Sequence, residues 1–153
     1  MKRSLLAELD PGGEAVREIA ISRSDADLLC TAAGERGASA AQADLTGCVD
    51  KETLLTRVAE ALEFPDWFGR NWDAFFDCLT DLSWLPASGH VLVLLNTAEM
   101  RRDAPEAFDT ARSIMQEAAG ILARRDQMFR VIIDVPTTRA KARPRRTPKR
   151  RKT

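Results

Sequence analysis

Residues 64–85 read FPDWFGRNWDAFFDCLTDLSWL, and this stretch contains all three tryptophans and four of the six phenylalanines of the chain. Its apolar residues recur at the i, i+3, i+4 and i+7 spacing of a helix face, at Trp72, Phe75, Phe76 and Leu79. This spacing predicts an amphipathic helix over about residues 71–82. Its apolar face is expected to pack into the core.

Aspartates occupy the other side of the same predicted helix. Asp73, Asp77 and Asp81 are four residues apart, so they stack on one helical face. Like charges at this spacing destabilise a helix by about 0.2–0.5 kcal/mol per pair, and Asp81 lies near the helix C-terminus, where an anion is disfavoured. The stripe is either an ordinary solvated face or a surface kept for a cationic partner.

The loop before this helix carries two aromatic residues. Trp67 and Phe68 stand between Pro65 and Gly69. Exposed aromatic side chains on a loop are frequent anchors of protein interfaces, so the loop and the helix together predict a binding surface.

The spacing of these residues resembles the barstar family, small protein inhibitors of a secreted bacterial ribonuclease. The resemblance rests on Leu62, Pro65, Trp67-Phe68, Gly69, Asn71, Asp73-Ala74 and the run Asp77-Cys78-Leu79-Thr80. A looser match extends over about residues 39–135. The resemblance implies an α/β fold with three-layer-like packing. A short parallel sheet of about three strands would pack with three to four helices, and no cofactor is implied.

The resemblance also implies roles for individual residues. Asp77 would occupy the phosphate-binding pocket of the ribonuclease, Asp73 would face a second basic residue, and Trp67 would stack on the catalytic histidine of the enzyme. The other implied contacts are Asn71 at the start of the helix, Gly69, Phe68, Phe76 and, on a later helix, Glu117. Phe76 stands where the founding member has tryptophan, and Arg70 where it has an acid, which suggests a different partner.

The zero formal net charge of the 153 residues conceals a split. From Arg139 to Lys152 there are nine Lys or Arg and no Asp or Glu. The rest of the chain keeps 14 basic and all 23 acidic residues, a net charge of −9. The acidic part should attract cationic proteins, whereas the basic tail predicts disorder.

Hydrophobic patterning divides the chain into three parts. Residues 1–38 form an N-terminal extension with a possible added strand (17–21) and helix (22–33). Residues 39–136 form the barstar-like domain, and residues 137–153 the basic tail. Within the domain, strands are predicted at 39–45, 90–96 and 129–135, helices at 50–62, 71–82 and 105–124, and a turn at 101–105. The apolar run HVLVLLN (90–96) is typical of a strand buried on both faces.

Few residues could support catalysis or bind a metal. The single histidine, His90, heads the buried strand and is interpreted as structural. Cys30, Cys48 and Cys78 lack metal-binding spacing and fit free thiols in a reducing cytoplasm. No apolar run approaches the ~20 residues that span a bilayer, so we expect a cytoplasmic protein without metal, cofactor or membrane contact.

Three functions are compatible with these observations. The first is an inhibitor, monomeric when free, that forms a 1:1 complex with a small basic ribonuclease. The alternative is a nucleic-acid-associated regulator that uses the tail, since nine cations could neutralise several phosphates. The weakest is a hydrolase acting through Asp73, Asp77 and Glu117. The sequence does not identify the target ribonuclease.

Overall fold

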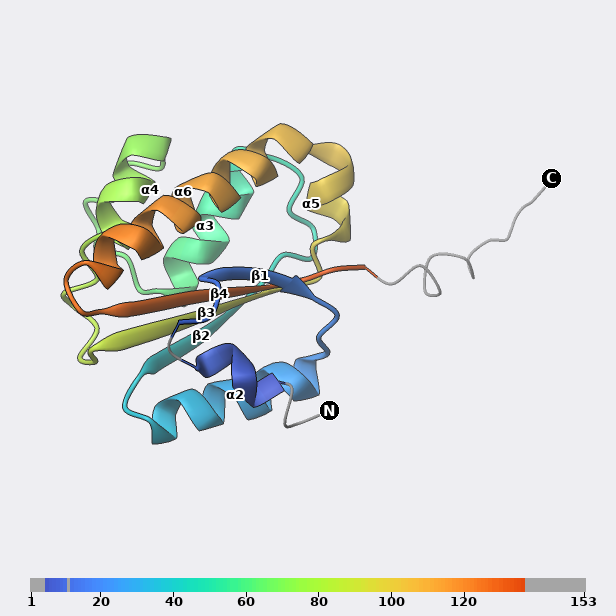
Figure 1. Cartoon of the computed structure of the whole chain (residues 1–153). Helices are drawn as coiled ribbons and strands as arrows, with labels where there is room; N and C mark the ends of the chain where they lie inside the picture. Colours follow the sequence, from blue (N-terminus) through green and yellow to red (C-terminus); the bar gives the residue numbers. More distant parts are fainter. Residues whose placement is uncertain (1–4, 11, 137–153) are drawn as a thin grey trace.

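The computed structural model describes residues 5–10 and 12–136 and contains a four-stranded, all-parallel sheet (Figure 1). Its strands, in chain order, are β1 (Val16–Ile19), β2 (Ser39–Asp44), β3 (Gly89–Leu95) and β4 (Met128–Asp134). The spatial order is β1-β4-β3-β2, so β4 and β3 are central. All seven residues of β3 are buried, which confirms the prediction of a strand covered on both faces.

Helices cover both faces of this sheet. Helix α2 (Arg23–Glu35) lies on one face. The opposite face is covered by four helices: α3 (Lys51–Ala61), α4 (Trp72–Leu79), α5 (Ala98–Asp103) and α6 (Pro105–Ala123). Alternate residues of β3 therefore enter two separate cores. Leu92 and Leu94 pack beneath α3, α4 and α6, whereas Val91 and Val93 pack against α2. The predicted α/β fold is confirmed, with three layers.

Local capping explains where the helices begin. Ser22 accepts a hydrogen bond from the Asp25 amide at the start of α2, and Asp50 accepts one from the Thr53 amide at the start of α3. Side-chain caps of this kind satisfy amide groups that have no partner within the helix. Pro105 occupies the first turn of α6, where its missing N–H costs nothing. These positions agree with the predicted helix starts.

Two predictions of local structure are wrong: the end of one helix and the position of one turn. Helix α4 ends at Leu79 instead of Leu82, because the chain then turns and Leu82 adopts a left-handed conformation (φ 51°). Asp81 therefore lies beyond the helix. The predicted turn at 101–105 is largely helical, since α5 continues to Asp103 and Pro105 begins α6 directly afterwards.

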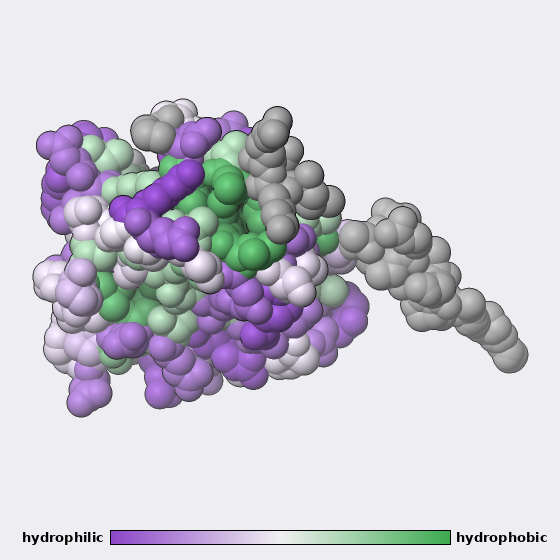
Figure 2. Space-filling model, turned by 90° about the horizontal axis from the view of Figure 1, so that it is seen from below, coloured by the Kyte–Doolittle hydropathy of each residue, from purple (hydrophilic) through white to green (hydrophobic). Residues whose placement is uncertain are grey.

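The N-terminal residues are integrated into the fold, as the possible added strand and helix suggested. β1 pairs with β4 at the sheet edge. A short 3-10 helix, η1 (Ala7–Leu9), precedes it, and Arg130 of β4 donates to the carbonyls of Glu8 (2.7 Å) and Asp10 (2.6 Å). Figure 2 shows the α2 side of the molecule, where hydrophobic side chains gather within a hydrophilic surface. The predicted disorder of 137–153 lies outside the described residues.

Candidate protein-binding surface

A cluster of aromatic rings fixes the loop that precedes α4. The ring of Phe64 meets those of Phe68 (centroids 4.9 Å apart) and Trp84 (6.0 Å) edge to face. Trp84 also donates its indole N–H to the Leu62 carbonyl at 2.9 Å. Edge-to-face pairs contribute about 0.5–1.5 kcal/mol beyond the area that they bury. These contacts fix the start of the loop at Phe64 and the ring of Phe68 within it.

Trp67 projects from this fixed loop. It is 62% exposed, the largest fraction among the exposed large hydrophobic residues of the described chain. Phe68 is half-buried and packs on the main core. The backbone between them and Pro65 closes a turn, in which the Phe68 amide donates to the Pro65 carbonyl at 3.0 Å. The predicted exposure of a loop aromatic thus applies mainly to Trp67.

Gly69, Arg70 and Asn71 join the loop to α4. A side chain at Gly69 would place a Cβ 3.2 Å from the side-chain nitrogen (Nδ2) of Asn71, so the Asn71 side chain would have to shift. Arg70 adopts a left-handed conformation (φ 56°). Asn71 caps α4 by accepting a hydrogen bond from the Ala74 amide at 2.8 Å. Asn71 therefore has a structural role in the free protein.

The carboxylates of α4 face solvent. Asp73 and Asp77 are exposed, and so is Asp81 in the following turn. Asp81 accepts a local hydrogen bond from the Ser83 amide at 3.2 Å. Within residues 5–10 and 12–136, no salt bridge involves Asp66, Asp73, Asp77 or Asp81. Trp67 and three exposed aspartates thus lie on consecutive segments of the chain: the loop, α4 and the turn after it.

The inner side of α4 packs into the core and so fixes the helix that carries these carboxylates. Phe75, Cys78 and Leu79 are fully buried, and Phe76 is half-buried. Burial raises the pKa of the Cys78 thiol to about 11, and the nearby Asp77 and Asp81 charges act in the same direction. Cys78 is a neutral, apolar packing residue, as predicted, because the thiolate is the reactive form of cysteine.

Glu117 lies on a separate element. It is exposed on α6 and borders an open depression shared with Val16, Glu18 and Arg112, on the side of β1. The described contacts do not join it to the carboxylates of α4. Its membership of the same binding surface stays a prediction.

An acidic depression beside the loop was missed by sequence reasoning. Its volume is about 300 Å³, and its polar lining includes Glu60, Glu63, Asp66 and Arg70, with Phe64 and Phe68 among its apolar residues. Its residues come from the end of α3 and from the loop, and Glu63 between them has a left-handed conformation (φ 57°) that residue spacing does not reveal. Carboxylates are therefore also present in the depression at the end of α3, outside α4.

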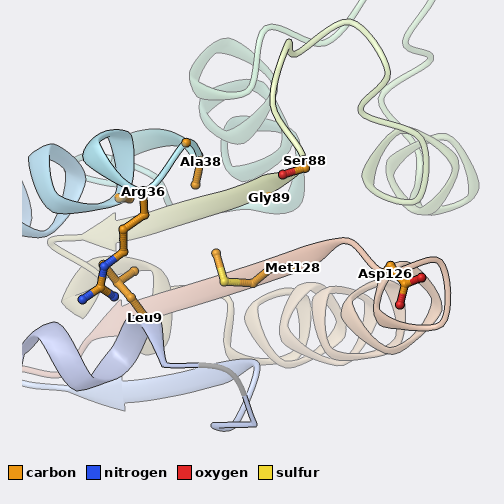
Figure 3. Close-up of a pocket in the computed structure, with 9 residues that line it drawn as sticks. Leu9, Arg36, Ala38, Ser88, Gly89, Asp126 and Met128 are labelled. Atoms are coloured by element: carbon orange, nitrogen blue, oxygen red, sulfur yellow. The ribbon is translucent and has the colours of Figure 1, made fainter.

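The remaining candidates do not form a reaction centre. His90 is buried, its Nδ1 lies 2.7 Å from the Ser39 hydroxyl, and burial lowers its pKa. A pocket of about 230 Å³ lies at the end of α2, with Arg36 and Asp126 at opposite ends (Figure 3). Among the described residues, no three His, Cys, Asp or Glu side chains are grouped to hold a metal. No helix in this part of the chain has the length and apolarity to cross a membrane.

Comparison with solved structures gives several matches, and the following one concerns the fold alone. The chain is similar to the Aeropyrum pernix ORC2 protein in its ADP form, with a TM-score of 0.62 and 16% identity. The match covers 91% of this chain and 40% of the ORC2 chain, so this protein spans less than half of the length of the ORC2 protein.

Two other matches concern the sequence. The chain is 36% identical over 83 residues to a Bacillus subtilis (strain 168) protein named "Putative ribonuclease inhibitor YrdF", covering 54% of this chain and 85% of that protein. A family model described as "Barstar (barnase inhibitor)" matches residues 38–134, which include β2–β4, the aromatic loop and α4. Since that model spans more than half of the sequence and includes the whole exposed surface of loop and helix, this chain belongs to the barstar family.

Proposed function

We propose that this protein inhibits a small basic ribonuclease by presenting the carboxylates of α4 where the enzyme binds RNA phosphates. The barstar family is a family of inhibitors, and its members are not enzymes. The hydrolase alternative with Asp73, Asp77 and Glu117 is therefore wrong. The family match and the name of the Bacillus relative support a ribonuclease as the partner.

The mechanism follows from what a ribonuclease site requires. An enzyme that holds RNA must present Arg or Lys to the phosphates, so a carboxylate in the same place forms charge-assisted hydrogen bonds with them. Asp77 takes this role, because it stands exposed on a helix whose inner side is fixed in the core. Asp73, one turn earlier, faces a second basic residue.

The loop supplies the apolar part of the interface. Trp67 stacks on the flat surface of a catalytic side chain, and Gly69 lets the two backbones approach closely. The further proposed contacts are Phe68, Asn71, Phe76 and Glu117. A complex of this kind is 1:1, with a free inhibitor that is monomeric and acts inside the cell that must be protected.

The observation that carries this proposal is the exposure of Asp77 on α4, without a salt bridge to any other described residue. In the described residues its carboxylate takes part in no salt bridge, so its binding capacity is available to a partner. A carboxylate already paired within the fold would have to lose that partner before it could bind another cation.

The test is retention of ribonuclease activity from a lysate of the source cells on the immobilised full-length protein. We expect Asp77→Ala to reduce the retained activity, because it should weaken the binding free energy by about 2–5 kcal/mol. This range is drawn in part from the barnase–barstar pair, which belongs to this family. The matched control is Glu35→Ala, which removes an exposed carboxylate from α2 on the opposite face of the sheet.

Equal retention by Asp77→Ala and the parent protein would remove Asp77 from the mechanism. Thermal unfolding of each variant is measured alongside, because a loss of fold would also reduce retention. We expect both variants to unfold within about 0.5 kcal/mol of the parent, as is usual for surface substitutions.

A further inference from the structure

The acidic surface has no cationic partner among the described residues. We define it as Glu60, Glu63 and Asp66 around the depression together with Asp73, Asp77 and Asp81. None of these six carboxylates takes part in a salt bridge in the described chain. Arg125, next to the end of α4, donates to the Thr80 carbonyl at 2.9 Å and not to a carboxylate. The outer face of α4 is therefore an unpartnered, negatively charged helix face.

The matching cations lie in one segment of the sequence. Nine of the 23 basic residues fall between Arg139 and Lys152, and the rest of the chain has a formal net charge of −9. By contrast, Arg17, Arg23, Arg101, Arg102 and Arg112 of the described part already form salt bridges. The nine cations of 139–152 are thus opposite in sign to the six carboxylates of the acidic surface, and they offset the net charge of −9 on the rest of the chain.

The segment is long enough to reach the acidic surface. β4 ends on the side of the molecule opposite to α4 (Figure 1). An extended chain spans at most about 3.3–3.6 Å per residue, so the 17 residues after Pro136 reach up to about 60 Å. A compact domain of about 136 residues has a radius of gyration of about 14 Å. The cations can thus approach any part of the surface of their own domain.

We propose that the basic segment 139–152 binds the acidic surface of its own chain and is displaced when the ribonuclease binds. The second half of this inference rests on the proposed function, whereas the first half does not. Attachment to the same chain gives the segment an effective concentration in the millimolar range. An exposed contact made by long Lys and Arg side chains is weak and screened by salt, so a preorganised ribonuclease site displaces it.

The segment would lower the apparent affinity of this protein for a ribonuclease. An intramolecular competitor lowers the apparent affinity by the fraction of molecules whose binding surface is free. Its effect disappears at high ionic strength. A weakly cationic protein would displace the segment less easily than a ribonuclease with a complete phosphate site. The segment would therefore add selectivity for such a ribonuclease.

The contact is tested on the full-length protein by ¹H–¹⁵N NMR. The parent is compared with a full-length variant in which the nine Lys and Arg of 139–152 are replaced by Gln. At about 20 mM salt we expect differences at the amides of Trp67, Asp73 and Asp77, and their loss at about 0.5 M salt. The control is α2, whose amides should not change.

Four outcomes would overturn the proposal. The spectra of the acidic surface could be identical in both proteins, or the differences could be confined to α2. The differences could fade on dilution, which would make a second copy the occupant. The variant could lose retention of an RNA oligonucleotide on a filter while the acidic surface stays unchanged, which would make the segment a nucleic-acid-binding arm.

A binding measurement tests the displacement separately. At low salt the neutralised variant should bind the retained ribonuclease up to about tenfold more tightly than the parent, and the two affinities should converge at high salt. An unchanged affinity at low salt would refute competition. If the NMR contact is present but neither protein binds a ribonuclease, the proposed function fails and the contact stands.

Discussion

Asp77 and Trp67 contribute different kinds of energy to the proposed interface. Asp77 supplies a negative charge at a defined position on α4, whereas Trp67 supplies apolar area from a loop fixed by Phe64 and Phe68. A tryptophan that is 62% exposed gains little from folding, and aromatic residues of this size dominate binding at protein interfaces. Its exposure makes sense if a partner covers it.

Truncation of Trp67 should separate binding from stability. We expect Trp67→Ala to weaken ribonuclease binding by about 2 kcal/mol or more and to change the free energy of unfolding by less than about 0.5 kcal/mol. The control is Leu28→Ala, which truncates an exposed apolar residue on α2. Titration calorimetry and urea unfolding measure the two quantities. Binding as tight as that of the parent would exclude Trp67 from the interface.

The helical period predicted the exposure of the aspartates and the burial of Phe75 and Leu79, but Phe76, on the same predicted apolar face, is only half-buried. Asp73 and Asp77 are four residues apart, and the structure leaves both exposed. The exposure of Phe68 and the place of Asp81 were not predictable in this way. They depend on the packing of Phe68 against Phe64 and on the early end of α4, which are tertiary effects.

At the scale of elements, α4 is too short to be stable alone. It has eight residues, whereas isolated helices shorter than about 12–15 residues are marginal in water. Its position is set by buried Phe75, Cys78 and Leu79 and by the cap at Asn71. The carboxylates are therefore placed by the core and not by the helix itself.

Loss of the cap at Asn71 should lower the stability of the fold. We expect Asn71→Ala to lower the free energy of unfolding by about 0.5–2 kcal/mol, because the Ala74 amide loses its acceptor. Asn71→Ser, whose hydroxyl can cap, should recover most of this loss. Urea unfolding of the three proteins measures the effect. Serine as damaging as alanine would show that the cap does not stabilise α4.

Helix α5 shows where sequence reasoning fails at this scale. Its six residues, AEMRRD, contain one buried apolar side chain, Met100, and give no helical period. The helix is held by tertiary contacts, since Arg101 lies over the Phe108 ring at 4.7 Å and donates to Glu18 at 2.8 Å. The long strands and α6 carry strong patterns and were predicted within a few residues.

At the scale of the whole molecule, two cores and a charged network unite the N-terminal residues with the family-matched part. Glu18 of β1 pairs with Arg101 of α5 and Arg112 of α6. Burial raises the pKa of Glu18, but the two guanidinium groups outweigh it and hold that pKa below its ordinary value. These partners lie 83 and 94 residues away in sequence, so no local pattern could reveal them.

Acid should destabilise the fold partly through Asp44. Hydrogen bonds from Asn96 and Thr46 lower the pKa of Asp44 to about 2. A lowered pKa stabilises the folded state above the ordinary value of 3.8, and this stabilisation is lost as pH falls from 3.8 toward about 2. We expect Asp44→Asn to be less stable than the parent at pH 5 and close to it at pH 2.

Urea unfolding over this pH range measures the difference, and Glu35→Gln on α2 is the control. A stability difference that is the same at pH 5 and pH 2 would show that the carboxylate charge of Asp44 is not the stabilising element.

In the proposed complex, the charge of Asp77 imitates a phosphate. The most direct test of this role is the inhibition constant of Asp77→Asn, which keeps the shape of the side chain and removes the charge, against the ribonuclease that the parent protein retains. We predict an increase of about 30-fold or more, equivalent to about 2 kcal/mol, with Glu35→Gln unchanged. An inhibition constant equal to that of the parent would contradict the account.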